Sequence, residues 1–256
     1  MPVRRVQFDS VSEGQAPVSL AGIFDLPEDS PRATAVFAHC FTCTKDIKAI
    51  ARISRLLSRH GIAVLRFDFR GLGASKGVFA DSNFLTNLDD IRAAVAFISN
   101  EIAPPQLLIG HSLGGAAMMA TAPEFDSVRG LVTLAAPSDT THLVQTLLRL
   151  NPAIGTEGQG DVVIGGMTHH VKQQMLNVLQ DFDLPDRIKQ LTIPHLIFHS
   201  KADQTVALKH AHNLLEWTGG PKLLVAPGDS DHLFVENSGD VAMIADFVNV
   251  WFSQIQ

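Results

Sequence analysis

Short, dense runs of apolar residues recur along the chain, and each predicts a buried β-strand. They are residues 34–38, 63–67, 107–109, 130–134, 195–198 and 222–225. Longer segments lie between them, in which apolar side chains return every three or four residues, as on one face of a helix. The clearest predicted helices are residues 46–59, 83–99 and 241–253.

The alternation of strands and helices predicts an α/β fold with a mostly parallel central sheet and helices on both faces. Residues 3–8 and 18–24 are strand-like with a polar stretch between them, which predicts an antiparallel hairpin at one sheet edge. The rhythm breaks at residues 137–185, where a glycine-rich stretch, an apolar run and a helix-like segment at 171–180 follow one another. We interpret residues 1–256 as a single domain with a small, cap-like insertion at 137–185.

Length and charge narrow the class of protein. The chain has 256 residues, and 46% of them are hydrophobic, which is enough for one sizeable core. It carries 20 basic and 26 acidic residues, a net charge of −6, and no run of Lys or Arg exceeds two. We therefore expect no nucleic-acid partner.

The sequence also bears on location. It has no stretch of about 18 apolar residues, so we expect no membrane-spanning helix and no membrane partner. Two arginines near the N-terminus are not followed by an apolar segment, so we expect no signal peptide and a cytoplasmic protein. Its two cysteines, Cys40 and Cys43, would then be reduced.

The segment Gly110-His111-Ser112-Leu113-Gly114 has the pattern G-x-S-x-G, between a predicted strand and an Ala/Gly-rich helix. This pattern places a serine on a tight strand-to-helix turn, where its hydroxyl is exposed for nucleophilic attack. Glycines are needed there because the strained turn brings backbone segments close together. We predict that Ser112 is the nucleophile and that the N–H of Leu113 faces a developing oxyanion.

A serine nucleophile needs a base, and the base needs an orienting acid. For a serine on such a turn, the acid and then the histidine follow it along the chain. Asp203 and His232 lie in loops after the strands 195–198 and 222–225, at the carboxyl ends where α/β sites are built. Asp229 and Asp231 are alternatives to Asp203, but they lie too near His232 in sequence to approach its ring easily.

Other residues with possible chemistry are given structural roles. His195 and His199 are four residues apart but bracket a buried strand without a third ligand nearby, so we predict no metal site. His169 and His170 are expected on the polar surface of the insertion, and His111 beside the serine is expected to shape the turn. The loop at 68–75 has only part of the dinucleotide-binding glycine pattern, so we expect no nucleotide and no other cofactor.

The loop after strand 34–38 should supply the second oxyanion donor, and by position this is the N–H of Phe41. His39 in the same loop is a candidate substrate-binding residue, together with the apolar side chains of Phe79, Leu143 and Met167 near predicted loop ends. These apolar side chains favour a small, uncharged acyl group.

Together these residues resemble the α/β-hydrolase superfamily over nearly the whole chain. The segments 39–46, 65–73 and 109–116 are similar to the hydrolase half of bacterial proteins that fuse an α/β-hydrolase to an OsmC-like peroxide-resistance domain. Many α/β-hydrolases have glycine where this chain has Cys40. The resemblance implies cleavage of small-molecule esters by a serine esterase.

Two alternatives stay open at this point. The chain could be a binding or regulatory module that kept the fold without the activity, although Ser112, Asp203 and His232 argue against it. It could also be a thiol-dependent antioxidant or a redox-responsive partner of OsmC-type peroxide resistance that uses Cys40 and Cys43. Against a redox role, the C-x-x-C lies across the oxyanion loop and not at a thioredoxin-like helix start.

Overall fold

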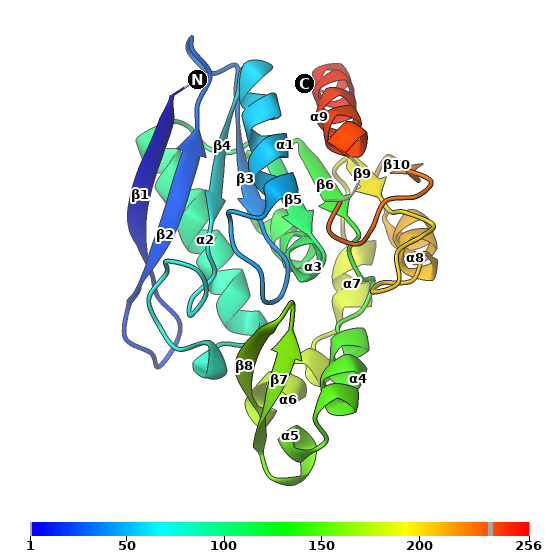
Figure 1. Cartoon of the computed structure of the whole chain (residues 1–256). Helices are drawn as coiled ribbons and strands as arrows, with labels where there is room; N and C mark the ends of the chain where they lie inside the picture. The colour runs from blue at the N-terminus through cyan, green and yellow to red at the C-terminus, as the bar shows by residue number, and fades with distance from the viewer. Residues whose placement is uncertain (1, 235–237, 256) are drawn as a thin grey trace.

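An eight-stranded sheet in the order β1-β2-β4-β3-β5-β6-β9-β10 runs through the middle of the computed structural model, which describes residues 2–234 and 238–255 (Figure 1). Its strands are β1 (Val3–Ser10), β2 (Val18–Asp25), β3 (Ala33–Ala38), β4 (Ile62–Phe67), β5 (Leu107–His111), β6 (Gly130–Leu134), β9 (His195–Phe198) and β10 (Lys222–Val225). From β4 to β10, neighbouring strands pair in parallel. The pair β1–β2 is antiparallel and lies at one edge, which confirms the predicted N-terminal hairpin.

Helices cover both faces of this sheet, which confirms the predicted fold class. The longer ones are α1 (Lys48–Arg59), α2 (Phe84–Glu101), α3 (Leu113–Thr121), α8 (Lys209–Trp217) and α9 (Ser238–Gln254). Successive side chains of a strand point to opposite faces, and in β3 Phe37 packs under α1 and α9 whereas Val36 packs under α2 and α3. Because both faces are covered, every residue of β3 is buried, and the strand is a continuous apolar run.

Residues 137–185, which the sequence analysis predicted to be an insertion and which we call the inserted segment, lie at the end of the molecule toward which the parallel strands run, opposite the two termini (Figure 1). It contains α4 (Thr141–Leu150), α5 (Ala153–Thr156), the antiparallel hairpin β7 (Gln159–Ile164) and β8 (Met167–Lys172), α6 (Gln173–Asp181) and the start of α7 (Leu184–Lys189). Leu147, Val162 and Val171 belong to the same core cluster as α2 and α3. The inserted segment therefore shares a core with the sheet domain.

The helix predicted at 171–180 begins later than expected. Val171 and Lys172 are the last residues of β8, and α6 starts at Gln173. Gly165 and Gly166 both have positive φ, as a two-residue hairpin turn requires, and the pairing across this turn draws Val171 into the sheet. Within the described ranges, no helix is long and apolar enough to cross a membrane.

One buried histidine sets a condition on stability. His195 begins β9, and its ring lies between the hydroxyls of Thr133, at 2.9 Å, and Thr218, at 3.1 Å. Burial lowers the pKa of His195 to about 3. In the unfolded chain a histidine takes up its proton near pH 6.5. The part of the free energy of unfolding that depends on a neutral His195 is therefore complete above about pH 6.5. It is lost as the pH falls toward 3.

We expect His195→Gln to weaken the acid dependence of the free energy of unfolding. The parental protein should lose stability from about pH 6.5 downward, with His195 contributing up to ~1.4 kcal/mol per pH unit. In the variant, the slope of the free energy of unfolding against pH should correspond to uptake of about one proton fewer on unfolding. Urea unfolding between pH 4.5 and 8 measures both slopes, and equal slopes would show that His195 is not the group responsible.

Candidate functional site

Ser112 lies in the sharp turn between β5 and α3. Its backbone has φ 53° and ψ −123°, a conformation that residues other than glycine rarely adopt. The Ser112 N–H donates to the carbonyl oxygen of Leu134 at 2.8 Å, which ties the turn to the end of β6. Strain of this kind persists where the surrounding structure holds it, and it is common at functional sites.

Glycines around Ser112 allow the backbone to pack on itself. A Cβ on Gly110 would lie 2.5 Å from the carbonyl oxygen of Gly114, inside the turn. A Cβ on Gly114 would lie 2.3 Å from the carbonyl oxygen of His39, in the loop after β3. The serine turn and the β3 loop are therefore in direct backbone contact, and glycine is required at that contact.

Three residues from distant parts of the chain form one line of hydrogen bonds. The Nε2 atom of His232 lies 3.0 Å from the Oγ of Ser112, and its Nδ1 atom lies 2.8 Å from the Oδ2 of Asp203. Asp203 is in the loop after β9, and His232 is in the loop after β10. The structure thus brings together the three residues that the sequence analysis selected as nucleophile, base and acid.

Asp203 is held by its own loop. Its Oδ1 atom accepts hydrogen bonds from the backbone N–H groups of Thr205 at 2.8 Å and Val206 at 2.9 Å. Burial alone would raise the pKa of the Asp203 carboxyl, but His232 and these two N–H groups outweigh it and lower the pKa below its usual value. Asp203 is therefore ionised at neutral pH and can orient the His232 ring.

Two further buried histidines, His111 and His199, hydrogen-bond to the loops that carry His232 and Asp203. The His111 Nε2–H donates to the backbone carbonyl oxygen of His232 at 2.8 Å, and the two rings lie 5.1 Å apart. Burial lowers the pKa of His111 to about 3, so its ring is neutral and keeps this contact through the neutral range. His199 donates to the carbonyl oxygen of Val206 at 2.7 Å, next to the Asp203 carboxylate. The sequence predicted that His111 shapes the turn, but its contact with His232 depends on folding.

The two residues predicted to supply the oxyanion donors lie beside the same small cavity. Phe41 and Leu113 both line a cavity of about 10 Å³, the size of one water molecule. Among the hydrogen bonds of the described residues, neither the N–H of Phe41 nor that of Leu113 has an acceptor. Leu113 is the first residue of α3, where a backbone N–H has no partner within the helix and favours negative charge.

The β3 loop differs from the sequence prediction in two ways. Cys40 and Cys43 form a disulfide, so the expectation of reduced thiols is wrong. His39 is completely buried; its Nδ1–H donates to the Cys40 carbonyl oxygen at 2.7 Å, and its Nε2 accepts the Phe69 N–H at 3.1 Å. Both ring nitrogens are engaged within the protein, so His39 supports the loop and does not offer a polar contact to a substrate.

Comparison with known proteins shows the family of the chain. The model of the alpha/beta hydrolase family matches residues 35–244, from β3 into α9. The chain belongs to this family. The hydrolase is 42% identical to the esterase domain of a Rhodothermus marinus protein, with a TM-score of 0.78 and 98% of each chain covered.

Other similar proteins are more distant. A monoacylglycerol lipase of Mycolicibacterium smegmatis is 23% identical to the hydrolase over 256 residues, which cover 88% of this chain and 89% of the relative. Est1E from Butyrivibrio proteoclasticus, solved with bound ferulic acid, has the same fold, with a TM-score of 0.82, 22% identity and coverage of 96% and 98%. The hydrolase is thus an enzyme of the esterase and lipase type.

An aromatic row leads from the β3 loop of the hydrolase to the inserted segment. The ring of Phe79, in the 3₁₀ helix η1 (Phe79–Asp81), lies 5.5 Å from that of Phe41 and 5.2 Å from that of His169 on β8. His169 is buried, so the prediction that it lies on the surface is wrong. Alternation along β8 places His169 on the same side as Val171, a signal that the sequence contained.

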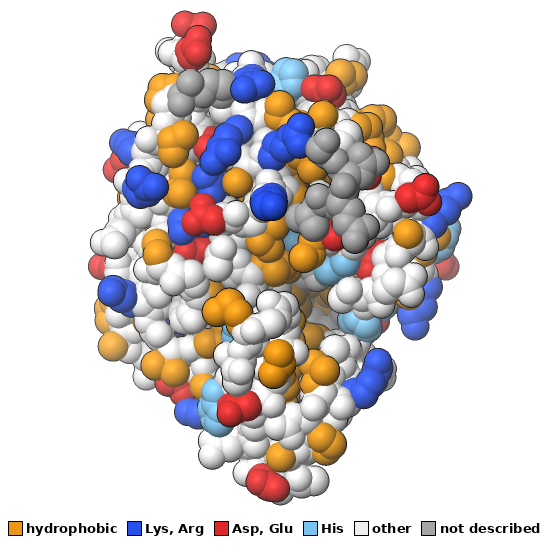
Figure 2. Space-filling model, viewed as in Figure 1, with side chains coloured by type: hydrophobic (Ala, Val, Ile, Leu, Met, Phe, Trp, Pro, Cys, Tyr) orange, Lys and Arg blue, Asp and Glu red, His pale blue; other side chains and the backbone are white. Residues whose placement is uncertain are grey.

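The remaining candidate lining residues are on the inserted segment. Leu143 is half-buried on α4, and Met167 is 65% exposed at the start of β8. Lys172, at the end of β8, forms an exposed ion pair with Asp81 of η1 at 2.6 Å. Figure 2 shows a hollow near the middle of this face, between the sheet domain and the inserted segment, with hydrophobic side chains along it.

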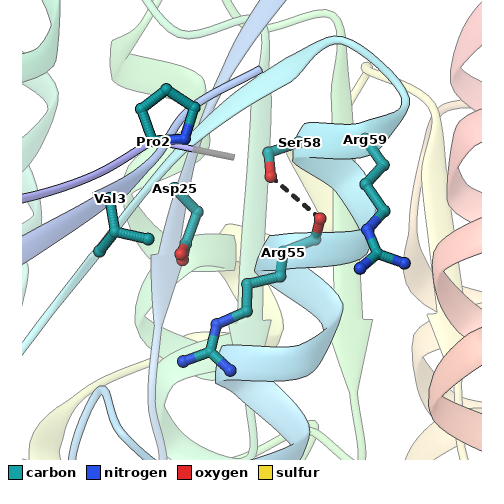
Figure 3. Close-up of a pocket in the computed structure, with 6 residues that line it drawn as sticks. All are labelled: Pro2, Val3, Asp25, Arg55, Ser58 and Arg59. Atoms are coloured by element: carbon teal, nitrogen blue, oxygen red, sulfur yellow. Dashed lines mark hydrogen bonds between the residues drawn. The ribbon is translucent and has the colours of Figure 1, made fainter. Parts of the chain in front are cut away.

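A second pocket lies away from this region, against α1 and the β1–β2 edge (Figure 3). It has a volume of about 270 Å³ and is lined by Pro2, Val3, Asp25, Arg55, Ser58 and Arg59. None of the predicted site residues borders it, so its size does not make it the active site.

Gly114→Ala should displace the β3 loop from the turn at Ser112, because the added Cβ would collide with the loop backbone. The loop follows β3 directly, so it cannot move without shifting this strand. We expect a loss of ester turnover of at least 100-fold, with lowered thermal stability. The matched control is Gly228→Ala, where a Cβ meets open space. Turnover of a nitrophenyl ester and thermal unfolding measure the two effects, and normal turnover in Gly114→Ala would contradict the close contact.

Proposed function

We propose that this hydrolase cleaves carboxylic esters through an acyl-enzyme on Ser112. The observation that carries the proposal is the line of hydrogen bonds from Ser112 Oγ to His232, at 3.0 Å, and from His232 to Asp203, at 2.8 Å. A hydroxyl in contact with an imidazole whose other nitrogen meets a carboxylate is the arrangement that activates serine.

The first half-reaction forms the acyl-enzyme. His232 Nε2 accepts the proton of Ser112 as Oγ attacks the ester carbonyl carbon. Asp203 holds the His232 ring in the tautomer with the proton on Nδ1 and stabilises the positive charge that develops on it. His232 then gives the proton to the leaving alcohol.

The second half-reaction releases the acid. Water takes the place of the alcohol, and His232 removes its proton as the water oxygen attacks the acyl carbon. The bond between the acyl carbon and Ser112 Oγ then breaks, and His232 returns the proton to Oγ. In both half-reactions the carbonyl oxygen becomes an oxyanion, and the N–H groups of Phe41 and Leu113 are the donors for it. Loss of one such donor costs about 2.7–4 kcal/mol of activation free energy.

The lining favours a small, uncharged acyl group. Phe41, Phe79, Leu143 and Met167 are apolar, and we propose that the inserted segment acts as a cap that brings the last two over the substrate. The similar proteins include a monoacylglycerol lipase, an esterase domain and a structure with ferulic acid, which supports an ester as the substrate class. The resemblance to the hydrolase half of OsmC fusion proteins stays a prediction.

Substitution of the three site residues tests the mechanism. We expect Ser112→Ala and His232→Ala to lower kcat for a short-chain nitrophenyl ester by about 10⁴-fold or more. Asp203→Asn should lower it by about 10⁴-fold, because the amide favours the wrong histidine tautomer. A fluorophosphonate should label Ser112 in the parental enzyme, as read by mass spectrometry.

The control is Asp229→Asn, which removes one of the two competing acids in the His232 loop and should leave kcat unchanged. Full activity in Ser112→Ala, or loss of activity in Asp229→Asn to the level of Asp203→Asn, would contradict the assignment.

The aromatic row should limit acyl length. Phe79→Ala removes the ring between Phe41 and His169, and the space released should accept a longer chain. Each methylene group that is accommodated in a hydrophobic pocket lowers the activation free energy by about 1–3 kcal/mol. The ratio of kcat/KM for an octanoyl ester to kcat/KM for a butanoyl ester should therefore rise at least 10-fold in the variant. Val163→Ala, on the exposed face of β7, is the matched control and should leave the ratio unchanged. The same ratio in both variants would place the acyl chain elsewhere.

A further inference from the structure

The Cys40–Cys43 disulfide encloses the residue that is expected to supply an oxyanion donor. The sulfur bridge and a backbone hydrogen bond, from the Cys43 N–H to the Cys40 carbonyl oxygen at 3.3 Å, close a four-residue turn. Phe41 is the second residue of this turn, so the direction of its N–H depends on the turn's conformation. Its side chain faces Phe79.

The loop is fixed independently on both sides of this turn. Before it, the His39 ring binds the Cys40 carbonyl oxygen and the Phe69 N–H. After it, Lys45 donates from its backbone N–H and from its Nζ to the Asp68 carboxylate, each at 2.7 Å, and both side chains are buried. Opening the disulfide would therefore leave the loop attached at His39 and at Lys45.

The second anchor, at Lys45, is held in place by Arg66 of β4. The Arg66 guanidinium donates to the Lys45 carbonyl oxygen at 2.8 Å and to the Asp46 carboxylate at 2.7 Å, and it pairs with the buried Asp25 at 2.7 Å. Between these anchors, the described contacts besides the disulfide include the Cys43–Cys40 backbone hydrogen bond and the ring contact of Phe41 with Phe79. The part of the loop that the disulfide controls is thus the part that carries the Phe41 N–H.

We propose that Cys40–Cys43 is a reversible modification site that positions the Phe41 donor: the oxidised form is the fully active one, and a dithiol that reduces the bridge lowers turnover. This inference rests on the proposed ester hydrolysis. A donor acts on the transition state only when it is already aimed at the oxyanion. Loosening the turn should therefore lower kcat and leave KM nearly unchanged.

The exchange chemistry has a defined entry point. Cys40 is 5% exposed, whereas Cys43 is half-buried, so a thiolate reaches the Cys43 sulfur more easily. Its attack forms a mixed disulfide with Cys43 and releases the Cys40 thiolate, which takes up a proton. The second thiol of the dithiol then displaces Cys43, so the dithiol is oxidised to its cyclic disulfide and the protein gains two thiols.

Dithiothreitol is the probe for the test, with nitrophenyl butyrate as substrate. Reduction to two titratable thiols per chain should lower kcat about 10-fold, change KM by less than twofold, and be reversed by oxidised dithiothreitol. The Cys40→Ser/Cys43→Ser variant should have the kcat of the reduced enzyme and no response to dithiothreitol. Circular dichroism should show that both forms stay folded.

The outcomes separate this inference from the proposed function. An oxidised enzyme without ester turnover and without a fluorophosphonate adduct on Ser112 would overturn the proposed function. An active enzyme whose kcat is unchanged or higher after verified reduction would overturn the redox inference alone. A lowered melting temperature with unchanged kcat would show a purely structural bridge, which also overturns it.

Discussion

The site depends on one backbone contact, between Gly114 after the nucleophile and the carbonyl oxygen of His39 in the loop after β3. The strand order places β3 directly beside β5, so the loops that follow these strands emerge next to each other. Without a side chain at Gly114, the two loops touch, and Phe41 and Leu113 line one water-sized cavity. The His232 loop joins this arrangement through its hydrogen bonds to Ser112 and His111.

Much of this arrangement could be predicted from the sequence, for physical reasons that are local. The central strands are buried on both faces, so dense apolar runs identify them. The turn at Ser112 needs glycines at fixed spacing, and that spacing is visible. Asp203 and His232 follow short apolar strands, and the carboxyl ends of parallel strands meet at one edge of the sheet. Chain order and strand ends were therefore enough to select the residues that the structure brings into hydrogen-bond contact.

The errors arose where tertiary contacts decide the outcome. A C-x-x-C pair does not reveal its redox state; the turn conformation brings Cys40 and Cys43 to a Cα–Cα distance of 5.3 Å, at which a disulfide forms. His39 was predicted to bind a substrate, but the Phe69 N–H donates to its Nε2 atom, so that this atom already has a partner within the protein. His169 and His170 were both predicted on the polar surface of the insertion, but only His170 is exposed. The alternation of β8 and the Gly165-Gly166 turn could have corrected the last error.

Dissolved salt should affect the buried ion pairs at the β3 loop less than the exposed ion pair of the inserted segment. Lys45 with Asp68, and Arg66 with Asp25, have almost no exposed side-chain surface, so ions in solution do not enter between them. The ion pair of Lys172 and Asp81, which joins the β7–β8 hairpin to η1, is open to solvent and is screened as salt rises. High salt should therefore weaken the link between the β7–β8 hairpin and η1 and leave the buried ion pairs at the β3 loop unchanged.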